Sequence, residues 1–278
     1  MGRGAIIAAA LLLLGAGPAR AAEPDAALAA VLEDPAADAA ARGRAVAEAA
    51  ARTDAGFGDS RVAVRMILHD GRGRTSERAL RLLTLEGTGE DGAGDRTLIV
   101  FDEPRSERGT ALLTWTLPGD DDQWLYLPAL KRVKRIAARN RSGPFVGSEF
   151  AYEDLTEEQV DAFEWRHEGV EGCSLGECHR VERIPVEPWS GYSRQVAWYD
   201  REALRLVRVE YFDRKGDLLK VLEATEWERS PEGYWRARRM DMRNELTGRR
   251  TELLWEPHAF GTGLDADDFT PEALERVR

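Results

Sequence analysis

The sequence has few of the residues that carry most enzyme chemistry. Only two cysteines can be found, and only four histidines among 278 residues. It contains no serine nucleophile elbow, no glycine-rich phosphate loop and no paired-histidine zinc helix. One cluster of carboxylates has no His, Cys or second carboxylate group at a spacing typical of glycosidases or metal sites. An acidic, solvated helix start explains this cluster more simply. Its members are Glu149, Glu153, Asp154, Glu157 and Glu158. We therefore predict a protein that is not an enzyme and that has no cofactor and no metal.

Long apolar runs are also missing, apart from one stretch near the N-terminus. This run, residues 5–16, is shorter than the roughly 18 to 20 residues that a membrane-spanning helix needs. It follows Arg3 and precedes an Ala-Arg-Ala triplet that ends at Ala21, an order typical of a secretory signal peptide. We expect residues 1–21 to be cleaved off after Ala21 and the rest of the chain to be exported.

Positive charge is scarce relative to negative charge. The formal net charge is −11, and loss of Arg3 and Arg20 with the signal peptide would bring it to −13 (−11 − 2). A net acidic exported protein is a poor ligand for polyanions. We predict no nucleic-acid partner.

The two cysteines lie close together, in the sequence Cys-Ser-Leu-Gly-Glu-Cys between two expected strands. In an oxidising compartment, Cys173 and Cys178 can close a disulfide across a hairpin. A metal site that includes the adjacent His179 is the rival interpretation, but it needs about four ligands at workable spacing. The remaining histidines are scattered singly: His69, His167 and His258.

Residues 57–262 show period-two alternation again and again, separated by glycine, aspartate, asparagine and proline turns. Val62, Val64 and Met66 point one way while Arg61 and Arg65 point the other. No helices are interleaved, as parallel strands would require. The pattern predicts a mainly β protein with one large antiparallel sheet of about 11 to 12 strands.

Helical segments are expected only around this sheet. Residues 22–56 are alanine-rich and predict two helices, and residues 263–278 predict a tail with a final helical turn that Thr270 caps. A further helical stretch is expected after Gly147. Residues 22–278 would then form a single domain.

A sheet of this size rarely stays open without curling, so we expect an incomplete β-barrel with a concave apolar face. Such a face must be covered, because large exposed apolar surfaces are rare on soluble proteins. The N-terminal helices and the stretch after Gly147 are the candidates. Alanine side chains are small, and they would cover a hollow without filling it.

Two stretches, residues 121–128 (Asp-Asp-Gln-Trp-Leu-Tyr-Leu-Pro) and 147–155 (Gly-Ser-Glu-Phe-Ala-Tyr-Glu-Asp-Leu), resemble the signature of an uncharacterised branch of the LolA/LolB-like superfamily, of the outer-membrane lipoprotein-sorting type. The resemblance covers the chain from about Ser60 onward. It implies a periplasmic, non-catalytic carrier or sensor that binds a lipid or lipoprotein acyl chain in a half-open barrel. The alternative that it implies is an accessory docking protein of an RND-type lipid exporter, and its partners would be that inner-membrane exporter or an outer-membrane acceptor, with transient membrane contact.

We expect the cavity lining among large apolar residues on strands that should be adjacent, because binding an acyl chain requires apolar area and nothing directional. An ordinary packed core would explain the same residues. The sequence does not decide which face of the strand with Trp124 lines the cavity, because both faces of that strand are apolar. Phe145 lies between glycines, either in a loop over the cavity or in a tight turn. The candidate lining residues are Met66, Leu113, Trp115, Leu117, Trp124, Tyr126, Phe145 and Phe150.

A dense basic run follows the aromatic strand. It could bind anionic headgroups, a membrane surface or an acidic partner. The alternative is a solvated edge strand that positive charge guards against aggregation. The candidate docking residues are Lys131, Arg132, Lys134 and Arg135.

Overall fold

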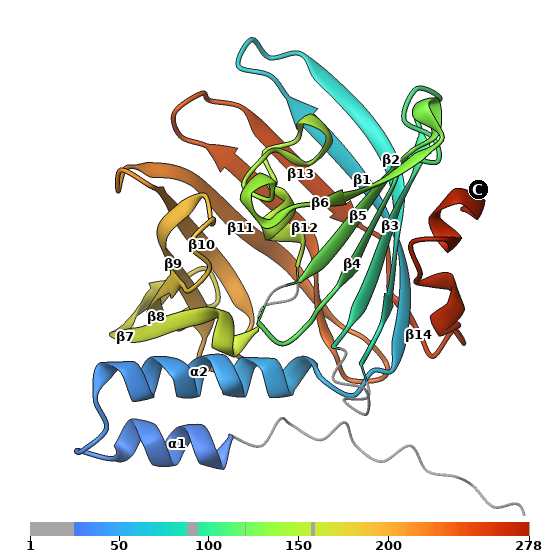
Figure 1. Ribbon diagram of the computed structural model, residues 1–278. Coiled ribbons are helices and arrows are strands. Elements are labelled where there is room, and N and C mark those ends of the chain that lie inside the picture. Colours follow the sequence, from blue (N-terminus) through green and yellow to red (C-terminus); the bar gives the residue numbers. More distant parts are fainter. Residues whose placement is uncertain (1–24, 88–93, 120, 157–158, 278) are drawn as a thin grey trace, which may run out of the picture.

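The computed structural model describes residues 25–87, 94–119, 121–156 and 159–277. The predicted signal peptide, residues 1–21, lies outside the described residues. Within them, the chain forms two α-helices and one antiparallel sheet of 14 strands (Figure 1). None of the helices described is long and apolar enough to cross a membrane.

The sheet consists of two meanders joined side by side. Its strand order is β6-β5-β4-β3-β2-β1-β13-β12-β11-β10-β9-β8-β7, and the short β14 pairs with β1 outside this order. The strands are β1 Asp59–His69, β2 Thr75–Leu85, β3 Arg96–Glu103, β4 Ala111–Trp115, β5 Asp122–Leu127, β6 Arg132–Ile136, β7 Phe163–Cys173, β8 Gly176–Pro185, β9 Tyr192–Asp200, β10 Leu206–Asp213, β11 Leu218–Arg229, β12 Trp235–Asn244, β13 Arg250–Trp255 and β14 Ala259–Phe260.

The strand order determines where the connection between β6 and β7 lies. β6 and β7 follow one another along the chain, yet they form opposite edges of the sheet. The connection between them must therefore run across the sheet from edge to edge, and it lies over the concave face (Figure 1). The expected large antiparallel sheet is confirmed, but it has 14 strands rather than 11 to 12, and it is an open sheet rather than a barrel.

The alanine-rich helices are α1, Ala26–Glu33, and α2, Ala39–Asp54. Each begins at an aspartate whose carboxylate accepts a backbone N–H of the first turn, Asp25 from Leu28 at 2.9 Å and Asp38 from Ala41 at 2.8 Å. α2 lies directly on β7, since a Cβ at Gly43 would come within 2.8 Å of a backbone nitrogen of β7. Only glycine allows this close approach.

Apolar side chains are buried on both faces of the sheet. On the concave face, one cluster joins residues of β1, β3, β10 and β12 to α2 and to the connection between β6 and β7. On the outer face, a second cluster packs residues of β3 and β4 against Phe269 and Leu274 of the C-terminal tail, both fully buried. The tail ends in a 3₁₀ turn, Ala273–Arg276, and the N–H of Ala273 donates to the Thr270 hydroxyl at 3.2 Å.

Candidate functional site

The inserted segment, residues 137–156, is the part of the β6–β7 connection that covers the upper half of the concave face in Figure 1. It contains three 3₁₀ turns in place of the expected helix: Ala138–Asn140, Phe145–Gly147 and Tyr152–Leu155. Its backbone–backbone hydrogen bonds to described residues all stay within the segment. The inserted segment is therefore a separate cover, and among the described residues each of its hydrogen bonds to the sheet involves a side chain.

Aromatic residues of the inserted segment fill the space beneath it. Phe145 is 1% exposed and Phe150 is 4% exposed. The Phe145 ring lies 5.6 Å from the ring of Phe101 on β3 and 5.7 Å from that of Tyr152. Phe145 thus packs into the core rather than lying in a loop above the cavity, and the concave face is filled by more than alanine.

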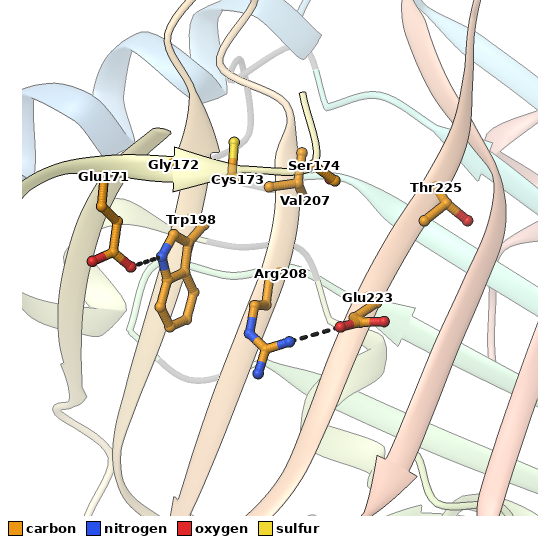
Figure 2. A pocket seen from close by; sticks show the side chains of 9 residues that line it. All are labelled: Glu171, Gly172, Cys173, Ser174, Trp198, Val207, Arg208, Glu223 and Thr225. Atoms are coloured by element: carbon orange, nitrogen blue, oxygen red, sulfur yellow. Dashed lines mark hydrogen bonds and ion pairs between the residues drawn. The ribbon is translucent and has the colours of Figure 1, made fainter. Parts of the chain in front are cut away.

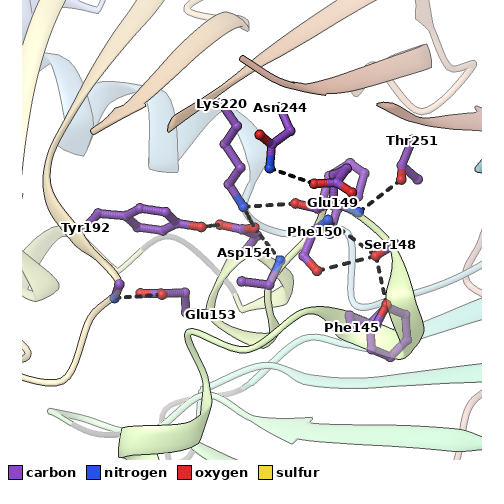
Figure 3. Close-up of polar contacts among 12 residues, drawn as sticks. Phe145, Ser148, Glu149, Phe150, Glu153, Asp154, Tyr192, Lys220, Asn244 and Thr251 are labelled. Atoms are coloured by element: carbon purple, nitrogen blue, oxygen red, sulfur yellow. Dashed lines mark hydrogen bonds and ion pairs between the residues drawn. The ribbon is translucent and has the colours of Figure 1, made fainter. Parts of the chain in front are cut away.

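A buried ion pair attaches the end of the inserted segment to the sheet. The Lys220 ammonium on β11 lies 2.5 Å from a carboxylate oxygen of Asp154, and both side chains are at most 5% exposed. The Tyr192 hydroxyl on β9 donates to the other carboxylate oxygen at 2.8 Å (Figure 3). We call Asp154, Lys220 and Tyr192 the latch.

Desolvation keeps the latch tyrosine a hydrogen-bond donor. Burial, followed by the nearby negative charge of Asp154, raises the pKa of Tyr192 well above its ordinary value. The ammonium of Lys220 also lies 5.1 Å from the ring centroids of Tyr192 and Tyr211 and donates to the Glu149 carbonyl at 3.0 Å. The charge on Lys220 is thus satisfied on several sides.

Two glutamates of the inserted segment add further attachments. Glu149 accepts from the Asn244 amide at 2.8 Å and pairs with Arg249 at 3.0 Å. Glu153 accepts from the Ser190 hydroxyl at 2.7 Å and from the N–H of Gly191 at 2.9 Å. Burial raises the pKa of Glu153. Glu149, Glu153 and Asp154 are therefore structural contacts rather than a solvated helix start, and Glu157 and Glu158 lie outside the described residues.

The backbone of the inserted segment is strained at Val146, where φ is +46°. A β-branched residue rarely adopts this conformation, which persists only when its surroundings impose it. Arg78 on β2 donates to the Val146 carbonyl at 2.5 Å, and Arg249 donates to the Gly147 carbonyl at 3.2 Å. Side chains of the sheet thus hold this turn in place.

The structure divides the predicted lining residues between the two faces. Met66, Phe145 and Phe150 belong to the concave cluster. Four others belong to the outer cluster under the C-terminal tail, Leu113, Trp115, Trp124 and Tyr126, and Leu117 lies beyond the end of β4 in neither cluster.

The prediction that Leu113, Trp115, Trp124 and Tyr126 line the concave face is wrong, because these residues of β4 and β5 lie on the outer face. Residues 111–114 are all buried, because the tail covers one face of β4 and the inner core covers the other. Leu112 rather than Leu113 faces inward, and the Trp115 indole donates to the Phe269 carbonyl at 2.7 Å. Alternation alone cannot tell the inner face from the outer one when both are apolar.

The sequence interpretation missed the apolar residues that remain partly exposed on the concave face. These residues pack against the concave cluster from β2, β11, β12 and β13: Leu82, Leu222, Met240 and Trp255. β11, β12 and β13 are neighbours at the centre of the sheet, and β1 separates them from β2. The alternation of Met240 and Met242 in β12 was the signal in the sequence that could have indicated this face.

Two cavities accompany these features. One, of about 330 Å³, lies on the outer face beside the hairpin of β7 and β8 and is lined by Trp198, Arg208 and Glu223 among others (Figure 2). The other, of about 180 Å³, lies beside the inserted segment and is lined by Glu149, Lys220 and other polar and small residues.

The β7–β8 hairpin confirms the predicted disulfide, since Cys173 and Cys178 are bonded to each other. Among the residues described, no three His, Cys, Asp or Glu side chains are grouped as metal ligands.

The basic run divides in the same way as the aromatic strand. Arg132 and Lys134 lie opposite Leu127 and Leu125 of β5 and so share the concave side. Arg135 lies on the outer side and pairs with Asp122. Lys131 lies in the turn before β6.

Solved structures similar to the chain reproduce this fold. An outer membrane lipoprotein-sorting protein domain from Vibrio parahaemolyticus shares 44% sequence identity with a TM-score of 0.82, over 85% of this chain and 100% of that one. A DUF1329 family protein from Desulfovibrio piger shares 30% identity with a TM-score of 0.80, over 85% and 99%. A LolA superfamily protein from Nitrosomonas europaea, 17% identical with a TM-score of 0.67 over 83% and 98%, shares the fold.

A family model described as "Uncharacterized protein" matches residues 93–276, and no curated protein matches the chain. The coverage and identity of the first two structures show more than a common fold. The chain belongs to the DUF1329 family, which has the LolA-like fold that the sequence predicted.

Proposed function

We propose that this protein is a non-catalytic periplasmic carrier that holds the acyl chain of a lipid or lipoprotein on its concave face. The observation that carries the proposal is the construction of the inserted segment, whose attachments to the sheet are side-chain contacts rather than strand pairing. A cover of this kind can be displaced without breaking the sheet. The name of the Vibrio structure, a lipoprotein-sorting domain, supports the same cargo class.

In this mechanism the inserted segment and the acyl chain exchange places. Without cargo, Phe145 and Phe150 shield the inner apolar residues from water. When cargo binds, its methylene groups replace these contacts, and each CH₂ removed from water contributes about 0.8 kcal/mol. The partly exposed side chains of Leu82, Leu222 and Met240 would contact the chain first.

The proposal is tested by identifying what co-purifies with the gently isolated exported protein. Native mass spectrometry should detect a bound lipid or lipopeptide in the wild type. Met240→Asp, which puts a charge on the concave face, should lose it. The matched control is Leu246→Asp, because Leu246 is 61% exposed in a turn.

Two results would contradict the proposal. One is the absence of any bound lipid together with no uptake of added long-chain fatty acid. The other is equal lipid content in Met240→Asp and the wild type.

A further inference from the structure

The β5–β6 turn presents the most exposed large hydrophobic side chain of the described residues. Leu130 is 67% exposed and ends a short 3₁₀ turn. The next residue, Lys131, adopts a left-handed conformation with φ of +46°, and β6 follows at once. The turn therefore carries one large, exposed apolar side chain at its tip.

Three cations without compensating charge follow this leucine in the sequence. Lys131, Arg132 and Lys134 are all exposed and form no ion pair with any described residue. Arg135, by contrast, is paired with Asp122. Uncompensated cations on three of four successive positions stand out in a chain whose net charge is −11.

A neighbouring turn of mixed charge lies beside the positive region without adding net charge to it. A Cβ placed on Gly109 would lie 3.2 Å from the Pro128 ring, so the β3–β4 turn lies against the β5–β6 turn. It brings exposed Arg105 and Arg108 to the same end of the sheet, together with the acidic Glu103 and Glu107. The balance over both turns and β6 remains positive.

We infer that the anionic patch of a phospholipid bilayer is the partner of this end of the sheet, with Leu130 entering the headgroup region and Lys131, Arg132 and Lys134 contacting lipid phosphates. The inference rests on the proposed carriage of acyl chains. A lone apolar side chain among flexible cations fits a fluid anionic surface, where the stems of lysine and arginine can also lie along the interface. An acidic protein face would instead require a fixed apolar complement to Leu130.

The position of the patch connects the membrane to the concave face. β6 is an edge of the sheet, and Arg132 and Lys134 share its concave side with Leu125 and Leu127 of β5. A chain that leaves the bilayer at this edge would meet the concave face directly, next to the inserted segment that begins where β6 ends. Docking at this edge shortens the path through water.

The test uses the full exported chain and vesicles of phosphatidylglycerol and phosphatidylethanolamine, compared with vesicles of phosphatidylcholine alone. Each basic residue near an anionic surface strengthens binding about five-fold, so Lys131→Ser, Arg132→Ser and Lys134→Ser combined should weaken binding about 100-fold at low salt. Leu130→Ser should weaken it further at high salt, where screening leaves mainly the apolar contact.

A control variant removes the same charge elsewhere. Arg61 near the start of β1, Arg229 at the end of β11 and Arg201 in the turn after β9 are exposed and lie toward the opposite end of the sheet. Their combined replacement by serine should change vesicle binding less than three-fold. An equal loss in both triple variants, or no preference of the wild type for anionic vesicles, would overturn the inference.

Two further measurements separate this inference from the proposed function and from a protein partner. If the wild type binds anionic vesicles but carries no lipid in mass spectrometry, the carriage proposal fails and the membrane contact stands. If the patch variant binds vesicles normally but no longer co-purifies with an RND-type exporter from detergent extracts, the patch is a protein-docking surface and the membrane inference is overturned.

Discussion

The latch offers the sharpest test of how the inserted segment is held. Replacing Lys220 by methionine removes the ammonium but keeps most of the side-chain volume. Asp154 would then remain buried, 3% exposed, without its counter-charge. The inserted segment should loosen from the sheet.

The expected cost follows from the burial of both partners. Breaking a buried ion pair by removing one partner costs about 3–5 kcal/mol. Asp154 keeps hydrogen bonds from the Tyr192 hydroxyl at 2.8 Å and from the N–H of Ala151 at 2.6 Å, which favours the lower end. We therefore expect Lys220→Met to lower the free energy of unfolding by about 3 kcal/mol.

The double variant isolates the charge. Asp154→Asn with Lys220→Met leaves an uncharged acceptor for Tyr192. The double variant should regain part of the free energy of unfolding that Lys220→Met loses, which corresponds to a coupling energy of about 2 kcal/mol between the two residues. Arg74→Met is the control, because Arg74 is 77% exposed in its pair with Asp70 and should cost less than about 1 kcal/mol.

Urea unfolding gives these free energies, and amide hydrogen exchange should show faster exchange in residues 137–156 of Lys220→Met. A cost equal to that of Arg74→Met, or unchanged exchange in the inserted segment, would refute the role of the latch.

Three further predictions concern other parts of the fold. Added long-chain fatty acid should change the tryptophan emission of the wild type and of Trp124→Phe but not of Trp255→Phe, since Trp124 is on the outer face; the opposite pattern would return the lining to the outer strands. Alkylation of the native, unreduced protein should label neither Cys173 nor Cys178, and replacing both by serine should cost about 2 kcal/mol for so short a loop. Burial, and then the nearby His167, lower the pKa of His179 to about 4. The neutral imidazole therefore contributes its full stabilisation above the unfolded-state pKa of about 6.5, and this stabilisation is lost as the pH falls toward 4. His179→Gln should flatten that part of the pH profile of the melting temperature, and an unchanged slope would contradict the assignment.

Much of the fold was predictable because it depends on local patterns. The alternation in β1 predicted a half-buried strand, and its inward residues Val62, Val64 and Met66 are buried, as is Ser60 on the same face. Short turns between alternating segments predicted an antiparallel meander. The spacing of Cys173 and Cys178 predicted a hairpin disulfide.

The candidate site was less predictable. The Gly-Ser-Glu-Phe-Ala-Tyr-Glu-Asp-Leu stretch is specific as a sequence motif, but the strand residues that bind Glu149 and Asp154 lie 38, 66 and 95 residues away along the chain, on β9, β11 and β12. No local pattern connects Asp154 to Lys220. The sequence therefore indicates solvated carboxylates at Glu149 and Asp154, and only the tertiary contacts show that they are paired.

The sequence by itself determined the class of this protein: alternation with period two specified strands, alanine specified the two helices, and charge and composition argued against nucleic-acid binding. Only the tertiary structure decided which face of each strand is the inner one, because β4 is buried on both sides. It also decided the role of residues 137–156. Long-range pairing of β1 with β13 sets β6 and β7 at opposite edges, and the chain between them has to cross the concave face.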